Sequence, residues 1–265
     1  MTATMSPGVG CLLRDWRQRR RLSQLDLSSA AEVSARHLSF VETGRSRPSR
    51  ELLLHLAEHL DVPLRERNGL LLAAGYAPAY RETSLSDEAM APVRTALETI
   101  LRSHEPFPAV IVDRHWNLVS ANGPALGVLT EGVATELLTA PVNVLRVSLH
   151  PGGLAPRIVN LDEWSAHLLD RLRREAAVAA DPHLTDLYDE LRGYPGVVEV
   201  EPAGVDPASM LFVPLRLRAG AVELSFFSTV ATFGTALDIT LAELSIESFF
   251  PADERTAAAL SGGRA

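Results

Sequence analysis

The feature that most constrains this chain is a series of helix start and stop signals within its first 75 residues. Ser23, followed three residues later by Asp26, predicts an N-cap with an acidic variant of the capping box. Ser34 predicts the cap of a further helix, which runs through Glu42 and ends at Gly44. Signals this close together leave room only for short helices joined by tight turns.

Apolar residues at helical spacing predict five short helices in this region. Their expected bounds, in chain order, are about 12–21, 23–31, 34–42, 50–60 and 64–74. In the fourth, Leu53, Leu56 and Leu60 fall on one face, which is typical of a helix that packs on a core. We therefore expect residues 1–75 to form a five-helix, all-α domain.

The second and third predicted helices carry a motif that resembles the Cro/C1 (Xre) helix-turn-helix. The matching segments are 23–28 (SQLDLS), 33–34 (VS), Leu38, 41–42 (VE), 44–45 (GR) and 48–49 (PS). The buried positions among them must hold two helices at a fixed angle around a tight turn. Glu32 departs from the family pattern, which most often has glycine there to allow a positive φ; we expect a strain of ~1 kcal/mol.

The resemblance implies that the third helix enters the major groove of double-stranded DNA. Residues near its amino end would then reach base edges: Ala35, Arg36, Ser39 and Phe40. Arg36 suits guanine O6 and N7, and Phe40 suits a thymine methyl. Phosphate contacts are expected from Gln24, His37, Arg45 and Arg47. A homodimer on an inverted-repeat operator is expected, and a protein-binding helical module is the alternative.

Charge is divided unevenly along the chain. The formal net charge is -8, yet residues 1–80 carry 11 Arg against 8 acidic residues, and residues 81–265 carry 14 against 25. The first part is therefore about +3 and the second about -11. A basic first domain attracts phosphates, whereas an acidic second domain is repelled by DNA.

Residues 76–86 form a polar segment that contains Pro78, and this composition predicts a linker. A second domain is expected over 87–265. Helical patterns cover 87–104 and 161–180. Strand patterns cover 109–112, 116–119, 210–218, 222–233 and 237–249. A hairpin, then helices, then a three-stranded meander predicts an α+β, PAS-like domain with an antiparallel sheet.

Further segments resemble the MmyB-like regulators over nearly the whole chain. They are 36–45 (RHLSFVETGR), 65–76 (RERNGLLLAAGY), 141–146 (PVNVLR), 149–152 (LHPG) and 233–240 (FGTALDIT). This resemblance implies a PAS-like ligand-binding domain and, as the best ligand analogy, a fatty-acid-like molecule.

Six residues are candidates for ligand contact. Arg146 and His150 suit a carboxylate, and Asn143 is a hydrogen-bond donor. A structural salt bridge is the alternative for Arg146. Trp116, Trp164 and Phe226 suit the wall of an apolar cavity or, alternatively, ordinary core.

Several classes of protein lose support from the sequence. A single cysteine, Cys11, offers neither a disulfide nor a multi-thiolate zinc site. His55 and His59 match H-x-x-E-H, but they lie on a predicted helix of the first domain, so we expect no metal. No secretory signal or membrane span is evident, and we expect a cytoplasmic protein, nucleoid-associated when bound to DNA.

No cofactor signal and no catalytic motif appears, and an enzyme is not expected. Two alternatives remain open for the second domain. In one, the domain serves only to dimerise or to bind a protein partner; in the other, it is an enzyme whose catalytic residues are dispersed along the sequence.

Overall fold

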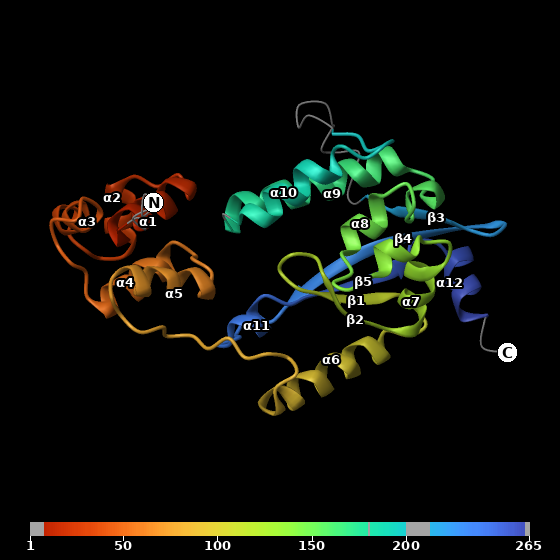
Figure 1. Ribbon diagram of the computed structural model, residues 1–265, viewed down its shortest axis with the longest axis horizontal. Coiled ribbons are helices and arrows are strands. Elements are labelled where there is room, and N and C mark those ends of the chain that lie inside the picture. Colours follow the sequence, from red (N-terminus) through yellow and green to blue (C-terminus); the bar gives the residue numbers. More distant parts are fainter. Residues whose placement is uncertain (1–7, 180, 200–212, 263–265) are drawn as a thin grey trace. The chain divides into compact units, whose positions relative to one another are not determined.

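The computed structural model describes residues 8–179, 181–199 and 213–262. Its contacts divide the chain into two compact units. The first unit runs to Thr83 and also includes the segment Thr235–Ala242, while the second holds Ser84–Gly234 and the chain from Glu243 onward. The chain therefore passes between the units at three points. Figure 1 labels the elements of both units.

Five helices make up the first unit up to residue 73, as predicted. They are α1 (Val9–Arg19), α2 (Gln24–Ala30), α3 (Ala35–Glu42), α4 (Arg50–His59) and α5 (Leu64–Ala73). The capping box at Ser23 is complete, since both the Ser23 hydroxyl and the Asp26 carboxylate accept a backbone N–H. The Ser34 hydroxyl caps α3 by accepting the backbone N–H of His37, without a reciprocal bond, and Gly44 beyond its end has a φ of 71°.

The helices of the first unit enclose one apolar core. Leu13, Leu27, Leu38 and Leu56 are each at most 1% exposed. α1 and α3 approach so closely that a Cβ atom on Gly10 would lie 2.3 Å from the carbonyl oxygen of Val41. Only glycine is compatible with that contact.

The turn between α2 and α3 has the predicted backbone. Glu32 has a φ of 52°, the left-handed conformation that favours glycine. A glutamate there is strained, while the helices on either side keep their caps. The departure from the family pattern therefore affects the turn and leaves the motif intact.

The second unit is an α+β domain. Its helices are α6 (Ala91–Ser103), α7 (Gly123–Thr130), α8 (Val144–Leu149), α9 (Leu161–Ala179), α10 (Pro182–Leu191) and α12 (Glu254–Ser261), with short 3-10 turns at Glu88–Met90, Thr135–Leu138 and Ala155–Arg157. Its strands are β1 (Ala109–Val112), β2 (Leu118–Ala121), β3 (Leu215–Ala219), β4 (Val222–Thr232) and β5 (Ser245–Pro251).

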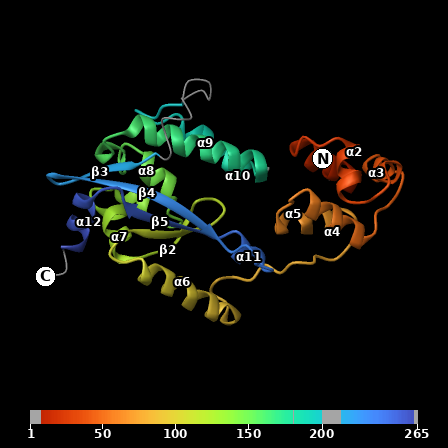
Figure 2. The same ribbon diagram turned by 180° about the vertical axis from the view of Figure 1, so that it is seen from behind.

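The strands form one antiparallel sheet in the order β2-β1-β5-β4-β3. The predicted hairpin is β1–β2, and the predicted meander is β3–β4–β5. The PAS-like α+β prediction is therefore confirmed. Figure 2 shows the same strands from behind, with β4 as the longest.

Four of the five predicted strands have other bounds in the structure, and the second and the last differ at their starts for a local reason. The second begins at Leu118, because the Asp113 carboxylate accepts the backbone N–H of His115 and Asn117 and holds a turn there. The last begins at Ser245, because Asp238 accepts the N–H of Thr240 and starts the helical turn α11 (Ile239–Ala242). The predicted strand 210–218 is Leu215–Ala219 in the structure: residues 213–214 are not strand, and residues 210–212 lie outside the described residues.

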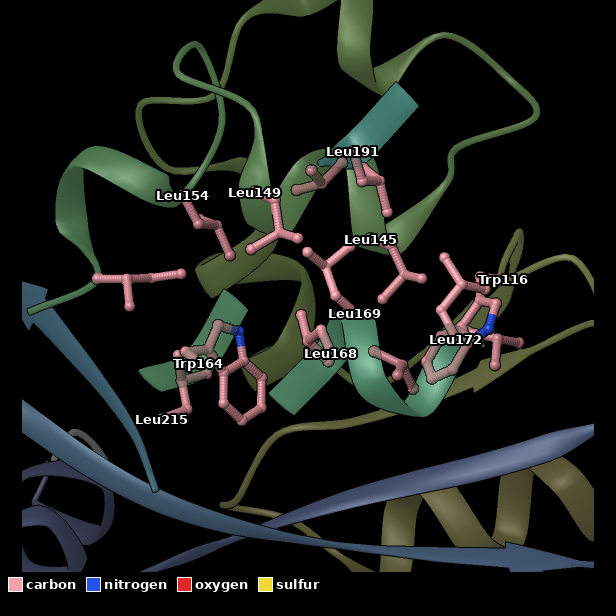
Figure 3. Close-up of a cluster of buried hydrophobic side chains, with 14 of the residues drawn as sticks. Trp116, Leu145, Leu149, Leu154, Trp164, Leu168, Leu169, Leu172, Leu191 and Leu215 are labelled. Atoms are coloured by element: carbon pink, nitrogen blue, oxygen red, sulfur yellow. The ribbon is translucent and has the colours of Figure 1, made fainter. Parts of the chain in front are cut away.

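Helices α7, α8 and α9 supply side chains to an apolar layer on one face of the sheet. Figure 3 shows this layer, with Trp116 and Trp164 on either side of Leu168. Strand positions alternate between faces, so Val110 faces this layer while its neighbour Ile111 points to the other side. α6 packs against β1, and α12 packs against β4 and β5.

The segment Thr235–Ala242 joins the first unit through backbone and side-chain contacts. The Asp238 carboxylate accepts hydrogen bonds from the backbone N–H and the hydroxyl of Thr83, at 3.1 and 2.6 Å. The Ile239 N–H donates to the Arg81 carbonyl at 2.8 Å, and Ile239 is 2% exposed. α11 also contacts α5. A piece of the chain between β4 and β5 is thus held beside the predicted linker.

Candidate DNA interface and ligand cavity

The outer face of α3 presents the predicted base-contacting residues. Ala35 and Arg36 are exposed, and Ser39 and Phe40 are half-buried. The Arg36 guanidinium lies 5.3 Å from the centre of the Phe40 ring, which restricts the long side chain without neutralising it. This face therefore offers a cationic fork beside an apolar ring.

A buried ion pair fixes α3 against the helices before it. Glu42, at the carboxyl end of α3, accepts two hydrogen bonds from Arg17 of α1, at 2.7 and 2.8 Å. Arg14 lies 3.6 Å away. Burial raises the pKa of Glu42, but the bonds from Arg17 and Gln24 outweigh it, so the pKa lies below its usual range. The carboxylate is charged at neutral pH and holds three helices together.

Gln24 and Arg47, predicted phosphate contacts, both make structural bonds. The Gln24 amide donates to Glu42 at 2.8 Å. The Arg47 guanidinium donates to the Ala74 carbonyl at 2.7 Å and lies over the Tyr76 ring. Their contact with DNA remains a prediction, as it does for exposed His37 and Arg45.

The two histidines of the H-x-x-E-H match bond to backbone. His55 Nε2 lies 2.8 Å from the Ala31 carbonyl, and His59 Nδ1 lies 2.9 Å from the His55 carbonyl. Within the part of the chain that the structure describes, no group of three or more His, Cys, Asp or Glu is placed to hold a metal ion.

The second unit contains an apolar cavity of about 70 Å³ between the sheet and the helices. Trp116, Trp164 and Phe226 line it, together with apolar residues of β1, α7 and α8. All three are at most 4% exposed. The predicted apolar wall is thus assembled from three distant stretches of sequence.

The other three predicted ligand contacts lie outside this lining. Asn143 caps α8 and donates to the His115 carbonyl, and Arg146 pairs with Glu190 at 2.7 Å. His150 accepts from the Gly152 N–H. Arg146 thus makes a structural salt bridge, and its contact with a ligand remains a prediction, as it does for Asn143 and His150. Asn143 and Arg146 line a separate, open and polar cleft of about 360 Å³.

An ionic cluster borders that polar cleft. Asp181, which caps α10, is bound by Arg114 and by His115, whose Nε2 lies 2.8 Å from the carboxylate. Burial raises the pKa of Asp181, but the bonds from Arg114 and His115 outweigh it and lower the pKa to about 2. The cluster ties the loop between β1 and β2 to the start of α10.

Two acids have a larger role in the structure than the sequence predicts. The sequence indicates Glu42 only as part of the motif, although it joins α1, α2 and α3. It indicates Glu247 only as one residue of a strand, yet this acid lines the apolar cavity and is 5% exposed. A lone acid at an inward-facing position of an apolar strand was the available signal.

A helix-turn-helix unit with an exposed cationic face, followed by a PAS-like domain with an internal cavity, defines a DNA-binding regulator with a ligand-binding domain. Comparison with protein families agrees. The model described as MmyB-like transcription regulator ligand binding domain matches residues 93–261, and a helix-turn-helix domain model matches residues 9–70. Because the first covers more than half of the chain, this chain belongs to the MmyB-like family.

Two solved structures show a distant similarity to this chain. The crystal structure of the clp gene regulator ClgR from Corynebacterium glutamicum is 24% identical, covers 37% of this chain and 90% of its own, and has a TM-score of 0.23. An RNA-binding light-oxygen-voltage receptor is 14% identical, with 97% of this chain and 62% of that chain covered and a TM-score of 0.26. Scores this low carry no functional argument. No curated protein matches the chain.

The described helices also include none that is long and apolar enough to span a membrane.

Proposed function

We propose that this chain is a homodimeric, non-enzymatic regulator whose α3 reads an inverted-repeat operator and whose PAS-like domain binds a small apolar or fatty-acid-like molecule. The observation that carries the ligand class is the cavity lined by Trp116, Trp164 and Phe226. An apolar chain buried between its walls is removed from water, and this removal is the main favourable contribution to the binding free energy of such a ligand.

The size of the cavity limits what enters without rearrangement. About 70 Å³ accommodates roughly five to seven water-sized groups, since each needs about 10–15 Å³ on this measure. Leu129 and Phe249 on its lining are only half-buried. A chain longer than a few methylenes would displace side chains at this edge, so binding and a change of shape are coupled.

Support for a route to the DNA-binding unit comes from the segment Thr235–Ala242. It continues β4, which lines the cavity through Phe226, and leads into β5, which lines it through Phe249. The segment itself belongs to the first unit. A ligand changes operator affinity only if it binds one arrangement of the dimer better than another. Displacement of these strands would supply that difference, alongside the linker and α6.

The test begins with native mass spectrometry of the purified full-length protein, followed by extraction of any bound compound. The recovered compound, or decan-1-ol if none is recovered, is then titrated while operator affinity is measured with delipidated protein. We expect an adduct or a saturable binding signal and a shift in operator affinity. Saturable binding that leaves operator affinity unchanged would contradict the sensor role and favour a domain that only dimerises.

A further inference from the structure

The apolar cavity contains a buried carboxylate. Among the described residues that line it, Ser148 of α8 and Glu247 of β5 are the polar ones. Glu247 is paired in register with Val110 and Val230, so its carboxylate leaves the sheet on the face that carries Val110. A buried acid costs free energy unless charge or hydrogen bonds satisfy it.

The cation beside Glu247 is shared. Arg171 of α9 lies 3.5 Å from the carboxylate, a long contact, and 3.0 Å from Glu175. Its guanidinium lies 4.2 Å from the centre of the Trp116 ring, and Trp116 Nε1 donates to Glu175. The Arg171 guanidinium thus pairs with two carboxylates, those of Glu175 and Glu247. Arg171 is not on the cavity lining, so a ligand meets the carboxylate and not the cation.

Ser148 offers a further polar atom on the helical side. Its oxygen accepts a hydrogen bond from Trp164 Nε1 at 3.0 Å. Burial raises the pKa of Glu247, and the charge of Arg171 together with hydrogen bonds from Ser228 of β4 and Arg171 opposes this only in part. A ligand that donates a further hydrogen bond to the carboxylate would add to these contacts without bringing a second charge into the cavity. An ionised ligand carboxylate would be repelled, and a ligand ammonium would lie close to the Arg171 charge and lose its hydration.

We propose that Glu247 selects the head group of the ligand, so that the cavity takes a single-chain amphiphile whose polar end is uncharged and donates a hydrogen bond, such as an alcohol or a primary amide. This inference rests on the proposed function, because it assumes that the cavity binds an apolar chain. It narrows the fatty-acid-like class to its uncharged members.

The test uses delipidated full-length protein and four probes with the same eight-carbon chain: octan-1-ol, octanamide, octanoate and octylammonium. Fluorescence of Trp116 and Trp164 on the cavity wall reports binding. At pH 8 we expect the alcohol and the amide to bind at least about tenfold more tightly than either charged probe, which corresponds to ~1.4 kcal/mol.

Glu247→Gln removes the charge and keeps the shape. We expect it to raise octanoate affinity by about tenfold, while Glu223→Gln, at a half-buried pair with Arg216 on the neighbouring strands, leaves all four affinities unchanged. The ranking in the unmodified protein tests the proposal even if the variant folds poorly.

Equal or tighter binding of a charged probe to the unmodified protein would overturn the head-group inference and leave the cavity proposal standing. The same holds if a folded Glu247→Gln variant binds octanoate no better. Binding of none of the four probes at millimolar concentration would overturn both proposals.

Discussion

Glu42 shows how a single residue positions the DNA-binding face. Its carboxylate accepts bonds from Arg17 and Gln24, so the end of α3 is tied to α1 and to the start of α2. Breaking such a buried pair leaves an uncompensated charge, which is far costlier than losing an exposed pair. The direction in which Arg36 points therefore depends on an ion pair on the opposite side of α3.

Arg36 provides a test of base reading. Arg36→Ala should relax base choice at one position of each half-site and cost ~1–3 kcal/mol there, because the fork contact to guanine is lost. Arg45→Ala, which removes an exposed charge beyond the helix, should weaken all sequences alike and reduce the salt dependence. Operator-variant titrations measure both; an equal loss on specific and random DNA for Arg36→Ala would show that another residue reads the base.

The ionisation of Asp181 makes the stability of the folded protein depend on pH. Its pKa is about 2 in the folded protein, below the ordinary value of 3.8, so its stabilisation is complete above the ordinary value and is lost as pH falls through about 2. That stabilisation is on the order of 2 kcal/mol. Asp181→Asn should lower the urea midpoint at pH 7 and flatten the fall between pH 4 and pH 2. The matched Asp189→Asn, at an exposed pair, should leave the curve unchanged. A parallel fall in both variants would contradict this assignment.

At the scale of elements, the segment Thr235–Ala242 links the sheet of the second unit to the first unit. Asp238 accepts two hydrogen bonds from Thr83, 155 residues earlier in the chain. The elements before and after the segment are strands of the cavity wall. A contact that holds the linker is therefore covalently continuous with the sheet that a ligand would touch.

This arrangement predicts that a substitution in the segment can change the effect of ligand on operator affinity without changing ligand binding in the cavity. Asp238→Ala should leave probe binding in the cavity unchanged, because Asp238 does not line it, but should reduce the effect of ligand on operator affinity. Glu136→Ala, at an exposed position of the 3-10 turn Thr135–Leu138, is the control. Fluorescence titration and operator titration are run on the same samples. An undiminished ligand response in a folded Asp238→Ala variant would exclude the segment as a route.

At the scale of the whole molecule, the DNA-binding part and the ligand-binding part of the chain carry opposite net charges. The basic residues 1–80 attract phosphates, and the acidic residues 81–265 are repelled by them. One helix-turn-helix unit contacts few base pairs, so specific binding favours a symmetric pair. Footprinting should therefore reveal an inverted repeat whose half-site centres lie about one helical turn apart or a multiple of it. A single asymmetric half-site bound by a monomer would contradict the dimer.

Local signals in the amino-acid sequence correctly predict the helices of the first unit, the motif between α2 and α3, and the antiparallel sheet. Caps such as Ser23 and Ser34, and the periodicity of apolar residues, are local signals, because both partners lie within a few residues of each other. The MmyB-like resemblance likewise rested on short contiguous segments.

Tertiary structure alone decided that Gln24 and Arg47 make internal bonds, that Asp238 holds Thr83, and that the acid in the last strand faces the cavity. Each of these depends on partners far away in the sequence. The predicted bounds of the last strand were wrong because the composition of 237–244 matches a strand, whereas Asp238 starts the helical turn α11 there and Thr235–Ala242 folds with the first unit. Local patterns specify elements, but the pairing of distant polar groups is fixed only when the elements pack.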